Sequence, residues 1–566
     1  VVIECKSPAL TNPIEEAITQ LLHYSNQRTR LRADINLGEE MIEGSEKLFY
    51  YNQLLVATSF FEARAGSVGS SYEGFLEWKD TYPLSQREVA TELGVPELSS
   101  QQLLVAGMLH PAHLLDILQN FIVFRETVKL IPRYVQFRAV RKMIDRLQSG
   151  KTRHQDGESD RRGGIVWHTQ GSGKSMTMVY LVRKMRRTES LNNFKIVVVT
   201  DRKDLQEQLS KTAILTGEDA LVAGTIRSMA TKLRRDYPDL VFVTIQKMRS
   251  VNEEEEQDEI EEEVGDIGIL NDSESILLLI DEAHRSHSNN QHAAMMKALP
   301  NAAKVGFTGT PILKGQRKRT EEIFGPFLDR YTIKQAELDG ATVSILYEGR
   351  RVEGDVVDKQ ALDFIFEEEF RDHTSKEKEI IKRRYANIPE VSDALKLIVA
   401  KADDMLRHYV SVALPEGLKA QVVARNREAA MRYRLALQQA KEKLIAEIRS
   451  LAPSLLAKNG DNVSSHDQRT QFLIDAHQYL PIIEQLEFAT VISGRGDDPQ
   501  YYQHWNNPQA HQRLIARFKR SLNDKDPARQ DRMAFICVAS MLLTGFDAPV
   551  EGVLYLDREM KQPHDL

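Results

Sequence analysis

A glycine-rich stretch, WHTQGSGKSMT, carries the strongest chemical signal in the sequence. It follows the apolar run GGIVW and precedes the helical pattern MTMVYLVRKMRR, and this strand–loop–helix order is typical of a phosphate-binding loop. Backbone N–H groups of such a loop surround phosphate oxygens, and the helix start adds partial positive charge. The residues predicted to form this loop are Thr169, Gly171, Ser172, Gly173, Lys174 and Ser175.

Two side chains of this loop have the chemistry that ATP requires. Lys174 is expected to reach the β- and γ-phosphates, and the Ser175 hydroxyl is expected to hold Mg²⁺. The strict motif has glycine at its first position, where this chain has His168. The glycines that approach phosphate are nevertheless present, so we expect an ATP site.

A second signal, ILLLIDEAH, places two acids directly after an apolar strand. Ligands bind at the carboxyl edge of parallel sheets, so both carboxylates are expected beside the phosphate loop. Asp281 is predicted to coordinate Mg²⁺, and Glu282 is predicted to orient and deprotonate the attacking water. His284 is predicted to connect this site to its neighbours by hydrogen bonds.

The first residues, VVIECKSPAL, offer a different chemistry. Residues two apart on a strand share a face, so Glu4 and Lys6 are expected to project together, with Cys5 opposite. Glu4 would hold Mg²⁺ and Lys6 would stabilise charge during phosphodiester hydrolysis, although a surface ion pair is the simpler alternative. Gln20 and Tyr24, four apart on the next helix, would brace such a site or contact a phosphate.

The elements that position these residues indicate an α/β protein. Short Val/Ile/Leu runs alternate with helical patterns, which predicts parallel sheets covered on both faces. Residues 47–66 read as strands, Pro111 suits a first helical turn, and residues 355–412 read as a helical connector. We predict three parts: a small mixed domain at 1–95, a first lobe with a helical lead-in at 96–345, and a connector with a second lobe at 346–566.

Composition sets broad limits on the environment and partners. Two cysteines in 566 residues, with no metal-type spacing, predict a reducing cytoplasmic setting, and no apolar run has the length of a membrane span. The net charge of -7 argues against a protein that coats nucleic acid over its whole surface, but it leaves room for a local basic groove. The acidic stretch 252–266 reads as a solvated loop, with a phosphate-mimicking role as the alternative.

Seven segments in order, HTQGSGKS, VVVTDRKDLQEQ, VTIQK, DEAH, GFTGTP, VVARNREAA and LLTGFDAP, resemble the motifs of superfamily 2 helicases and translocases. The resemblance implies two RecA-like lobes. It also implies that Gln136 reads adenine and that Thr308 and Thr310 link ATP state to lobe movement. It assigns Asp201, Arg202, Thr244 and Gln246 to the nucleic-acid track, and Arg425, Thr544, Gly545 and Asp547 to the cleft between the lobes.

The Glu4–Lys6 strand with Gln20 and Tyr24 resembles the PD-(D/E)xK nuclease core. Joined to the motor, it resembles the R subunit of type I restriction endonucleases over nearly the whole chain. That resemblance implies an ATP- and Mg²⁺-dependent translocase of double-stranded DNA with a fused endonuclease. Its implied partners are methylation and specificity subunits, and no membrane is involved.

The resemblance also implies two motifs outside these 566 residues. The family's first nuclease acid would precede Val1, and its final arginine motif would follow Leu566. We therefore expect this chain alone to be weakly active or inactive in cleavage and ATP turnover. The alternatives are a superfamily 2 helicase or repair remodeller with a non-catalytic first domain, and a nucleotide-gated DNA scaffold. A type III restriction subunit fits less well, because its nuclease would follow the motor.

Overall fold

The computed structural model of the chain divides into two compact units, Val1–Ile345 and Leu346–Leu566. Within the described residues, no helix is both long and apolar enough to cross a membrane. The residues that the structure describes are 1–25, 44–125, 128–200, 210, 217, 219–223, 225–244, 268–283, 290–309, 320–350, 395–456, 467–494, 498, 502–524, 526, 529–543, 546 and 548–558.

The first unit begins with a small sheet of order β1-β2-β3, in which β1 and β2 are parallel and β2 and β3 are antiparallel. Leu55 and Ala57 face helix α1, while Val56, between them, faces the core that continues into the rest of the unit. The face of the small sheet that is turned away from α1 therefore packs against the rest of the first unit. Its strands and the helices that follow are β1 (Val2–Cys5), α1 (Pro13–Tyr24), β2 (Leu55–Thr58), β3 (Ala63–Gly66), α2 (Gln86–Leu93), α3 (Ser100–Gly107) and α4 (Pro111–Asn120).

The strand prediction for 47–66 was wrong at its start, because Glu46–Phe49 forms a 3₁₀ helix. Only Phe49 is buried there, whereas Leu48, Tyr50 and Tyr51 are exposed. A high density of aromatic residues favours a strand, but a half-buried strand also needs buried and exposed residues to alternate. This segment has one buried residue among exposed neighbours, so it does not show that alternation. The prediction for Pro111 is confirmed, since α4 begins at that residue.

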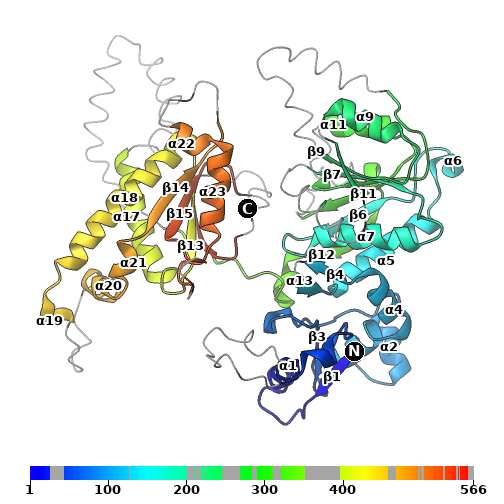
Figure 1. Ribbon diagram of the computed structural model, residues 1–566, viewed down its shortest axis with the longest axis horizontal. Coiled ribbons are helices and arrows are strands. Elements are labelled where there is room, and N and C mark those ends of the chain that lie inside the picture. Colours follow the sequence, from blue (N-terminus) through cyan, green and yellow to red (C-terminus); the bar gives the residue numbers. More distant parts are fainter. Residues whose placement is uncertain are drawn as a thin grey trace, which may run out of the picture. The chain divides into compact units, whose positions relative to one another are not determined.

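A seven-stranded sheet of order β12-β6-β11-β10-β7-β9-β8 forms the centre of the first unit, and all its neighbouring strands are parallel. Helices α5 and α7 cover one face, and α9 and α11 cover the other (Figure 1). Strand β7 shows the reason: Ile196 and Val198 enter the first core, and Val197 and Val199 enter the second. The predicted α/β class with parallel sheets is confirmed.

The remaining elements of this unit are β4 (Val123–Arg125), β5 (Val128–Leu130), α5 (Tyr134–Ser149), α6 (Arg153–Asp156), β6 (Gly164–His168), α7 (Lys174–Arg187), β7 (Lys195–Thr200), β8 (Ala220–Ala223), α9 (Ile226–Arg234), β9 (Leu240–Thr244), β10 (Ile276–Ile280), α11 (Asn290–Ala298), β11 (Ala303–Thr308), β12 (Phe327–Tyr331) and α13 (Ile333–Leu338), with the short 3₁₀ helix Tyr72–Gly74.

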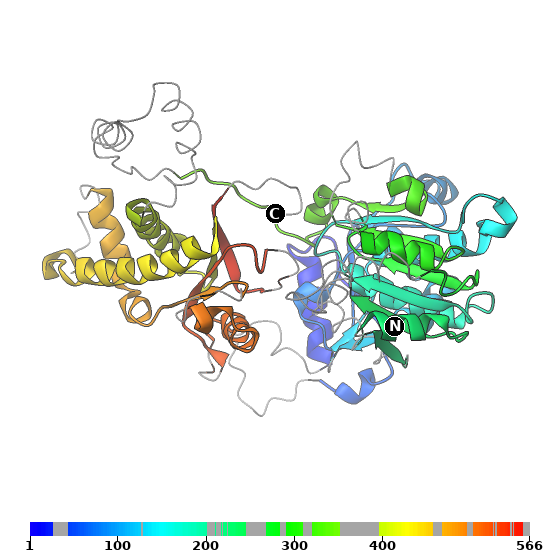
Figure 2. The ribbon, with the colours of Figure 1, turned by 90° about the horizontal axis from the view of Figure 1, so that it is seen from above.

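The second unit contains a parallel sheet of order β14-β15-β13-β16. Figure 2 shows α17 and α18 side by side on it, and both helices contribute to one core, while α23 packs on the other face. Helix α17 falls within the predicted connector, whose residues 355–394 lie outside the described residues. The elements are α17 (Leu395–Val412), β13 (Lys419–Ala424), α18 (Arg427–Arg449), α19 (Pro453–Leu456), α20 (Gln468–His477), α21 (Leu480–Ile483), β14 (Glu487–Val491), α22 (Gln503–Asn506), α23 (Pro508–Phe518), β15 (Met533–Val538) and β16 (Glu551–Asp557).

Lys419, at the start of β13, is fully buried, and its Nζ lies 3.4 Å from the carbonyl oxygen of Arg517. Burial lowers the pKa of Lys419 to about 8, and the charge of Asp531 opposes this shift only in part. At pH 7 the folded protein therefore holds a buried ammonium. We expect Lys419→Met to raise the free energy of unfolding of the second unit by roughly 1–3 kcal/mol at that pH.

The pH dependence distinguishes charge from packing. Between about pH 8 and the ordinary lysine pKa of 10.5, the unfolded chain binds more protons than the folded one. Wild-type stability should rise with pH across this window, so the advantage of Lys419→Met should shrink between pH 7 and pH 10 in denaturant titrations. Lys443→Met, on an exposed side chain of α18, is the control. An advantage of equal size at both pH values would show that charge is not the cause.

Candidate functional site

The phosphate loop leaves the carboxyl end of β6 and enters α7 at Lys174. Gly171 and Gly173 both have positive φ angles, of 75° and 82°, which favour glycine. A Cβ atom at Gly173 would lie 2.4 Å from Gln136 Nε2, so any side chain there would displace the amide of Gln136. Within the loop, the Ser172 hydroxyl donates to the Thr169 carbonyl at 2.7 Å. The loop thus has the closed backbone that the glycine spacing predicts.

Lys174 is half-buried at the centre of this site. Its ammonium donates to the carbonyl oxygen of His168 at 3.2 Å, and Thr169 O lies 3.5 Å away. Burial lowers the pKa of Lys174, while the charges of Glu282 and Asp281 oppose that shift. The structure therefore brings the loop lysine and both acids into one electrostatic neighbourhood at the carboxyl edge of the sheet.

The acids follow β10 directly. The Asp281 amide donates to the Val199 carbonyl at 3.0 Å, which continues the β10–β7 pairing past the end of the strand. Glu282 has a φ of 50°, in the left-handed region that side chains other than glycine seldom occupy. Such backbone strain persists where the surroundings require it, and it occurs often at functional sites.

The end of β11 lies against the same loop. A Cβ atom at Gly309 would lie 2.8 Å from Lys174 Nζ and 3.1 Å from Gln170 Cγ. Thr308, the residue before it, is fully buried. The GFTGTP segment, as far as Gly309, is thus in contact with the residue expected to bind phosphate.

Gln136 lies on the first turn of α5, beside the loop. Its Oε1 accepts from the Arg133 amide at 2.9 Å, and its Nε2 donates to the Gly173 carbonyl at 3.1 Å. The side chain therefore braces the phosphate loop. Its predicted contact with adenine remains a prediction.

In the small sheet, Glu4 and Lys6 form an ion pair of 3.0 Å, and both side chains are largely shielded. The hydrogen bond with Glu4 raises the pKa of Lys6, and the charges of Tyr24 and Glu16 on α1 add to this effect. Val2, on the same strand face, packs in the core under α1. The E-x-K pair therefore faces the helix that carries Gln20 and Tyr24, and Cys5 is exposed on the opposite face.

Other predicted positions are described only in part. Thr244 ends β9, and Arg425 follows β13 directly and precedes the Asn426 cap of α18. Outside the described residues lie Asp201, Arg202, Gln246, His284, Thr310, Thr544, Gly545, Asp547 and the acidic stretch 252–266.

Ser175 and Asp281 supply a hydroxyl and a carboxylate beside the loop, and Mg²⁺ prefers such hard oxygen ligands. This donor set fits the expected magnesium ion of an ATP site. Among the described residues, no cluster of three or more His, Cys, Asp or Glu side chains forms a separate metal centre.

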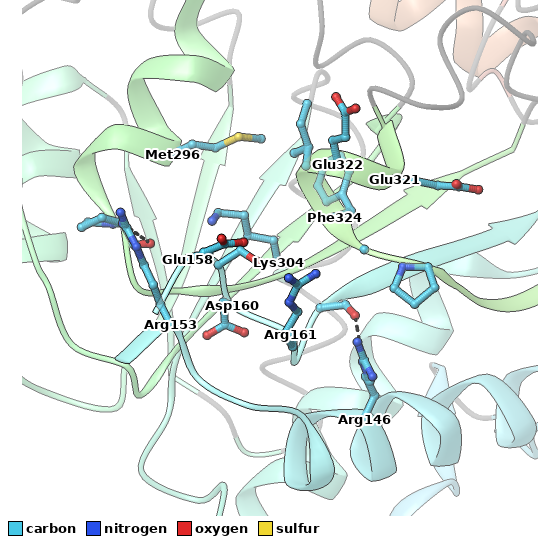
Figure 3. Close-up of a pocket in the computed structure, with 16 residues that line it drawn as sticks. Arg146, Arg153, Glu158, Asp160, Arg161, Met296, Lys304, Glu321, Glu322 and Phe324 are labelled. Carbon is cyan, nitrogen blue, oxygen red and sulfur yellow. Dashed lines mark hydrogen bonds between the residues drawn. The ribbon is translucent and has the colours of Figure 1, made fainter. Parts of the chain in front are cut away.

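A cavity of about 600 Å³ lies elsewhere on the first unit (Figure 3). Gly163 and Pro326, which precede β6 and β12, and Lys304 near the start of β11 all line it. The cavity is therefore at the amino-terminal edge of the sheet. It is separate from the phosphate loop, which is at the carboxyl edge.

Sequence reasoning missed one part of the site. His168 is buried and lies 2.7 Å from Asp329 on β12, 161 positions later in the chain. The available signal was the departure from glycine at the first loop position, but nothing in the local sequence identifies the partner.

Two protein-family models match parts of this chain. The SWI2/SNF2 ATPase family model matches residues 135–379, and the model for type I restriction enzyme subunit R domain 3 matches residues 419–566. The type I restriction enzyme HindI endonuclease subunit of Haemophilus influenzae is 28% identical over 98% of this chain and 47% of its own length. The SauCOLORF180P endonuclease subunit of Staphylococcus aureus is 22% identical over 83% of this chain and 45% of its own.

Among solved structures, the ATP-dependent Type ISP restriction-modification enzyme LlaBIII bound to DNA is 13% identical, with a TM-score of 0.41, over 77% of this chain and 26% of that chain. The chain spans about half the length of the curated relatives it matches. Residues 135–379 thus match a SWI2/SNF2 ATPase domain and residues 419–566 match domain 3 of type I restriction enzyme subunit R, and nearly the whole chain is similar to an endonuclease subunit of a type I restriction enzyme.

Proposed function

We propose that this chain belongs to the motor and cleavage subunit of a type I restriction complex, an ATP-dependent translocase of double-stranded DNA with a fused Mg²⁺-dependent endonuclease. The observation that carries the proposal is the phosphate loop, with Lys174 beside Asp281 and Glu282, in the same unit as the Glu4–Lys6 pair. The two curated relatives described above, both named as endonuclease subunits, support the same function.

In the ATP site, Lys174 would exchange its two carbonyl contacts for phosphate oxygens. Ser175 and Asp281 would hold Mg²⁺, which supplies charge neutralisation at the β- and γ-phosphates when bound. Glu282 would orient the attacking water and accept its proton. Gln136 would keep the loop in place, and would read adenine with its remaining hydrogen-bonding capacity.

The remaining predicted positions take roles in coupling. Thr308, Thr310 and His284 would respond to ATP state, and Arg425, Thr544, Gly545 and Asp547 would complete the nucleotide cleft from the second lobe. The nucleic-acid track would include Asp201, Arg202, Thr244 and Gln246. Hydrolysis would thereby drive movement along DNA.

In the nuclease face, Glu4 would hold a second Mg²⁺ and Lys6 would stabilise the developing charge on the phosphate. Gln20 and Tyr24 would position the DNA backbone from α1. Methylation and specificity subunits would hold the recognition site, and the complex would act in the cytoplasm.

Translocation can be measured directly. The whole protein, assembled with its methylation and specificity subunits, should displace a third-strand oligonucleotide annealed at a distance from the recognition site. Displacement should need ATP, and its delay should grow in proportion to that distance. A delay independent of distance would contradict translocation.

A further inference from the structure

The segment that leaves the small sheet is tied to the ATPase part of the first unit by two ionic contacts. Lys79 lies 2.8 Å from Asp339, just after α13. Asp80 lies 2.7 Å from Arg138 on α5, and also accepts the Tyr82 amide at 2.7 Å. β12 is an edge strand of the seven-stranded sheet, and Figure 1 shows β12 and α13 on the side of the first unit that faces the small sheet.

Arg138 also forms an ion pair with Asp329, which lies deeper in the unit. Its Nε and one terminal nitrogen lie 2.8 and 3.0 Å from the two Asp329 oxygens, and Lys142 adds a contact of 2.8 Å. The Asp329 side chain is only 1% exposed. Burial by itself opposes its ionisation, but hydrogen bonds from His168 and Arg138 outweigh burial and hold the pKa of this carboxyl well below its ordinary value.

Asp329 in turn holds the first residue of the phosphate loop. His168 Nε2 lies 2.7 Å from Asp329 Oδ2, and burial lowers the pKa of His168, so the neutral ring donates from Nε2. Its Nδ1 atom is buried and has no hydrogen-bond partner among the described residues.

His168 also meets Lys174 through its backbone. The carbonyl oxygen of His168 accepts from the ammonium of Lys174, which ATP phosphates would draw away. Its neighbour Thr169 donates its amide to the Tyr331 carbonyl at 3.0 Å. Nucleotide binding would therefore change the backbone contacts of His168, and the side chain of the same residue is bonded to Asp329.

We propose that Asp80, Arg138, Asp329 and His168 form a positioning relay, through which the phosphate loop and the segment leaving the nuclease-like sheet sense each other. The relay rests on the proposed ATP site. Charge-assisted hydrogen bonds strengthen one another in a chain that leads from partly exposed to buried groups, and coupling between two sites acts in both directions. Loss of the outermost member, Asp80, should therefore weaken ATP binding at a loop that it does not touch.

The test measures the dissociation constant for Mg²⁺–ATP in the whole protein by calorimetry. Asp80→Asn should weaken binding about threefold to tenfold. Asp145→Asn is the matched control: Asp145 lies on α5, as Arg138 does, and accepts from the segment that contains Asp80, through the Tyr82 hydroxyl at 2.7 Å. Within the described residues, no hydrogen bond or ion pair joins Asp145 to Arg138 or Asp329. This variant should leave ATP affinity unchanged.

A double-mutant cycle then locates the path. His168→Leu removes the donor at similar size and should weaken ATP binding about tenfold. His168→Gln, which restores an N–H donor near the Nε2 position, should recover affinity to within about threefold. In the His168→Leu background, Asp80→Asn should have no further effect, because the relay is already cut. Cooperative thermal melts establish that each variant is folded.

The outcomes separate this proposal from the ATP site itself. Equal effects of Asp80→Asn and Asp145→Asn would overturn the relay, as would an Asp80→Asn effect that persists beside His168→Leu. If His168→Leu does not fold, the comparison of Asp80→Asn with Asp145→Asn decides alone. Unchanged ATP binding in Lys174→Ala would instead overturn the proposed ATP site.

Discussion

Lys174→Ala is expected to weaken ATP binding by about two orders of magnitude and to remove DNA-stimulated ATP turnover in the whole protein. Lys174 is the first residue of α7, directly after the loop, and two glycines with positive φ angles shape the backbone that leads to it. Its removal leaves Asp281 and Glu282 without the neighbouring positive charge that acts on them. Their repulsion of the ATP phosphates adds to the loss.

Glu282→Gln separates chemistry from binding at the same site. The amide keeps the size of the side chain but cannot accept the proton of the attacking water. Turnover should therefore fall about 10²- to 10⁴-fold, while ATP affinity stays within about threefold of wild type. Steady-state turnover and calorimetry on the same preparations give both quantities.

Lys184→Ala provides the control for these two variants. Lys184 is on the same helix as Lys174 but pairs with Asp116, about 15 Å further along the helix axis. Its loss should leave ATP affinity unchanged. Wild-type turnover in Lys174→Ala would mean that the loop does not hold the nucleotide, and full DNA-binding function without ATP binding would favour a scaffold.

The second large effect is expected at the small sheet. Glu4→Ala and Lys6→Ala, made in the full-length protein, should each reduce DNA cleavage at least about a thousandfold, with ATP turnover within about twofold of wild type. Glu4 would no longer hold the metal, and Lys6 would no longer stabilise charge on the phosphate. Glu4 lies on β1 and Lys6 follows the end of that strand, and both face α1, so we expect neither change to affect the ATP site.

Cys5→Ser tests whether the strand itself is sensitive. Cys5 lies between the two residues, is exposed on the opposite face, and should tolerate the change without loss of cleavage. Linearisation of supercoiled plasmid and ATP turnover are measured for all three variants. Normal cleavage in Glu4→Ala and Lys6→Ala would support the alternative, a helicase or remodeller whose first domain is not catalytic.

Local patterns predicted the elements well where one periodicity dominates. The apolar runs of β6, β7 and β10 are buried on both faces, and their sheet is parallel as those runs predicted. The i and i+2 spacing placed Glu4 and Lys6 on one strand face, and their ion pair agrees. The prediction was wrong at Glu46–Phe49, where Phe49, Tyr50 and Tyr51 together resemble a strand sequence but only Phe49 is buried in a core.

By itself, the sequence determined the phosphate loop, the acids after β10 and the parallel architecture, because each depends on residue spacing within one element. Only the tertiary structure decided which distant groups support them. Gln136 on α5 forms a hydrogen bond with Gly173, and His168 forms one with Asp329 on the neighbouring edge strand. Such pairings follow from strand order and from the exclusion of water around buried polar groups, and neither is written in a local pattern.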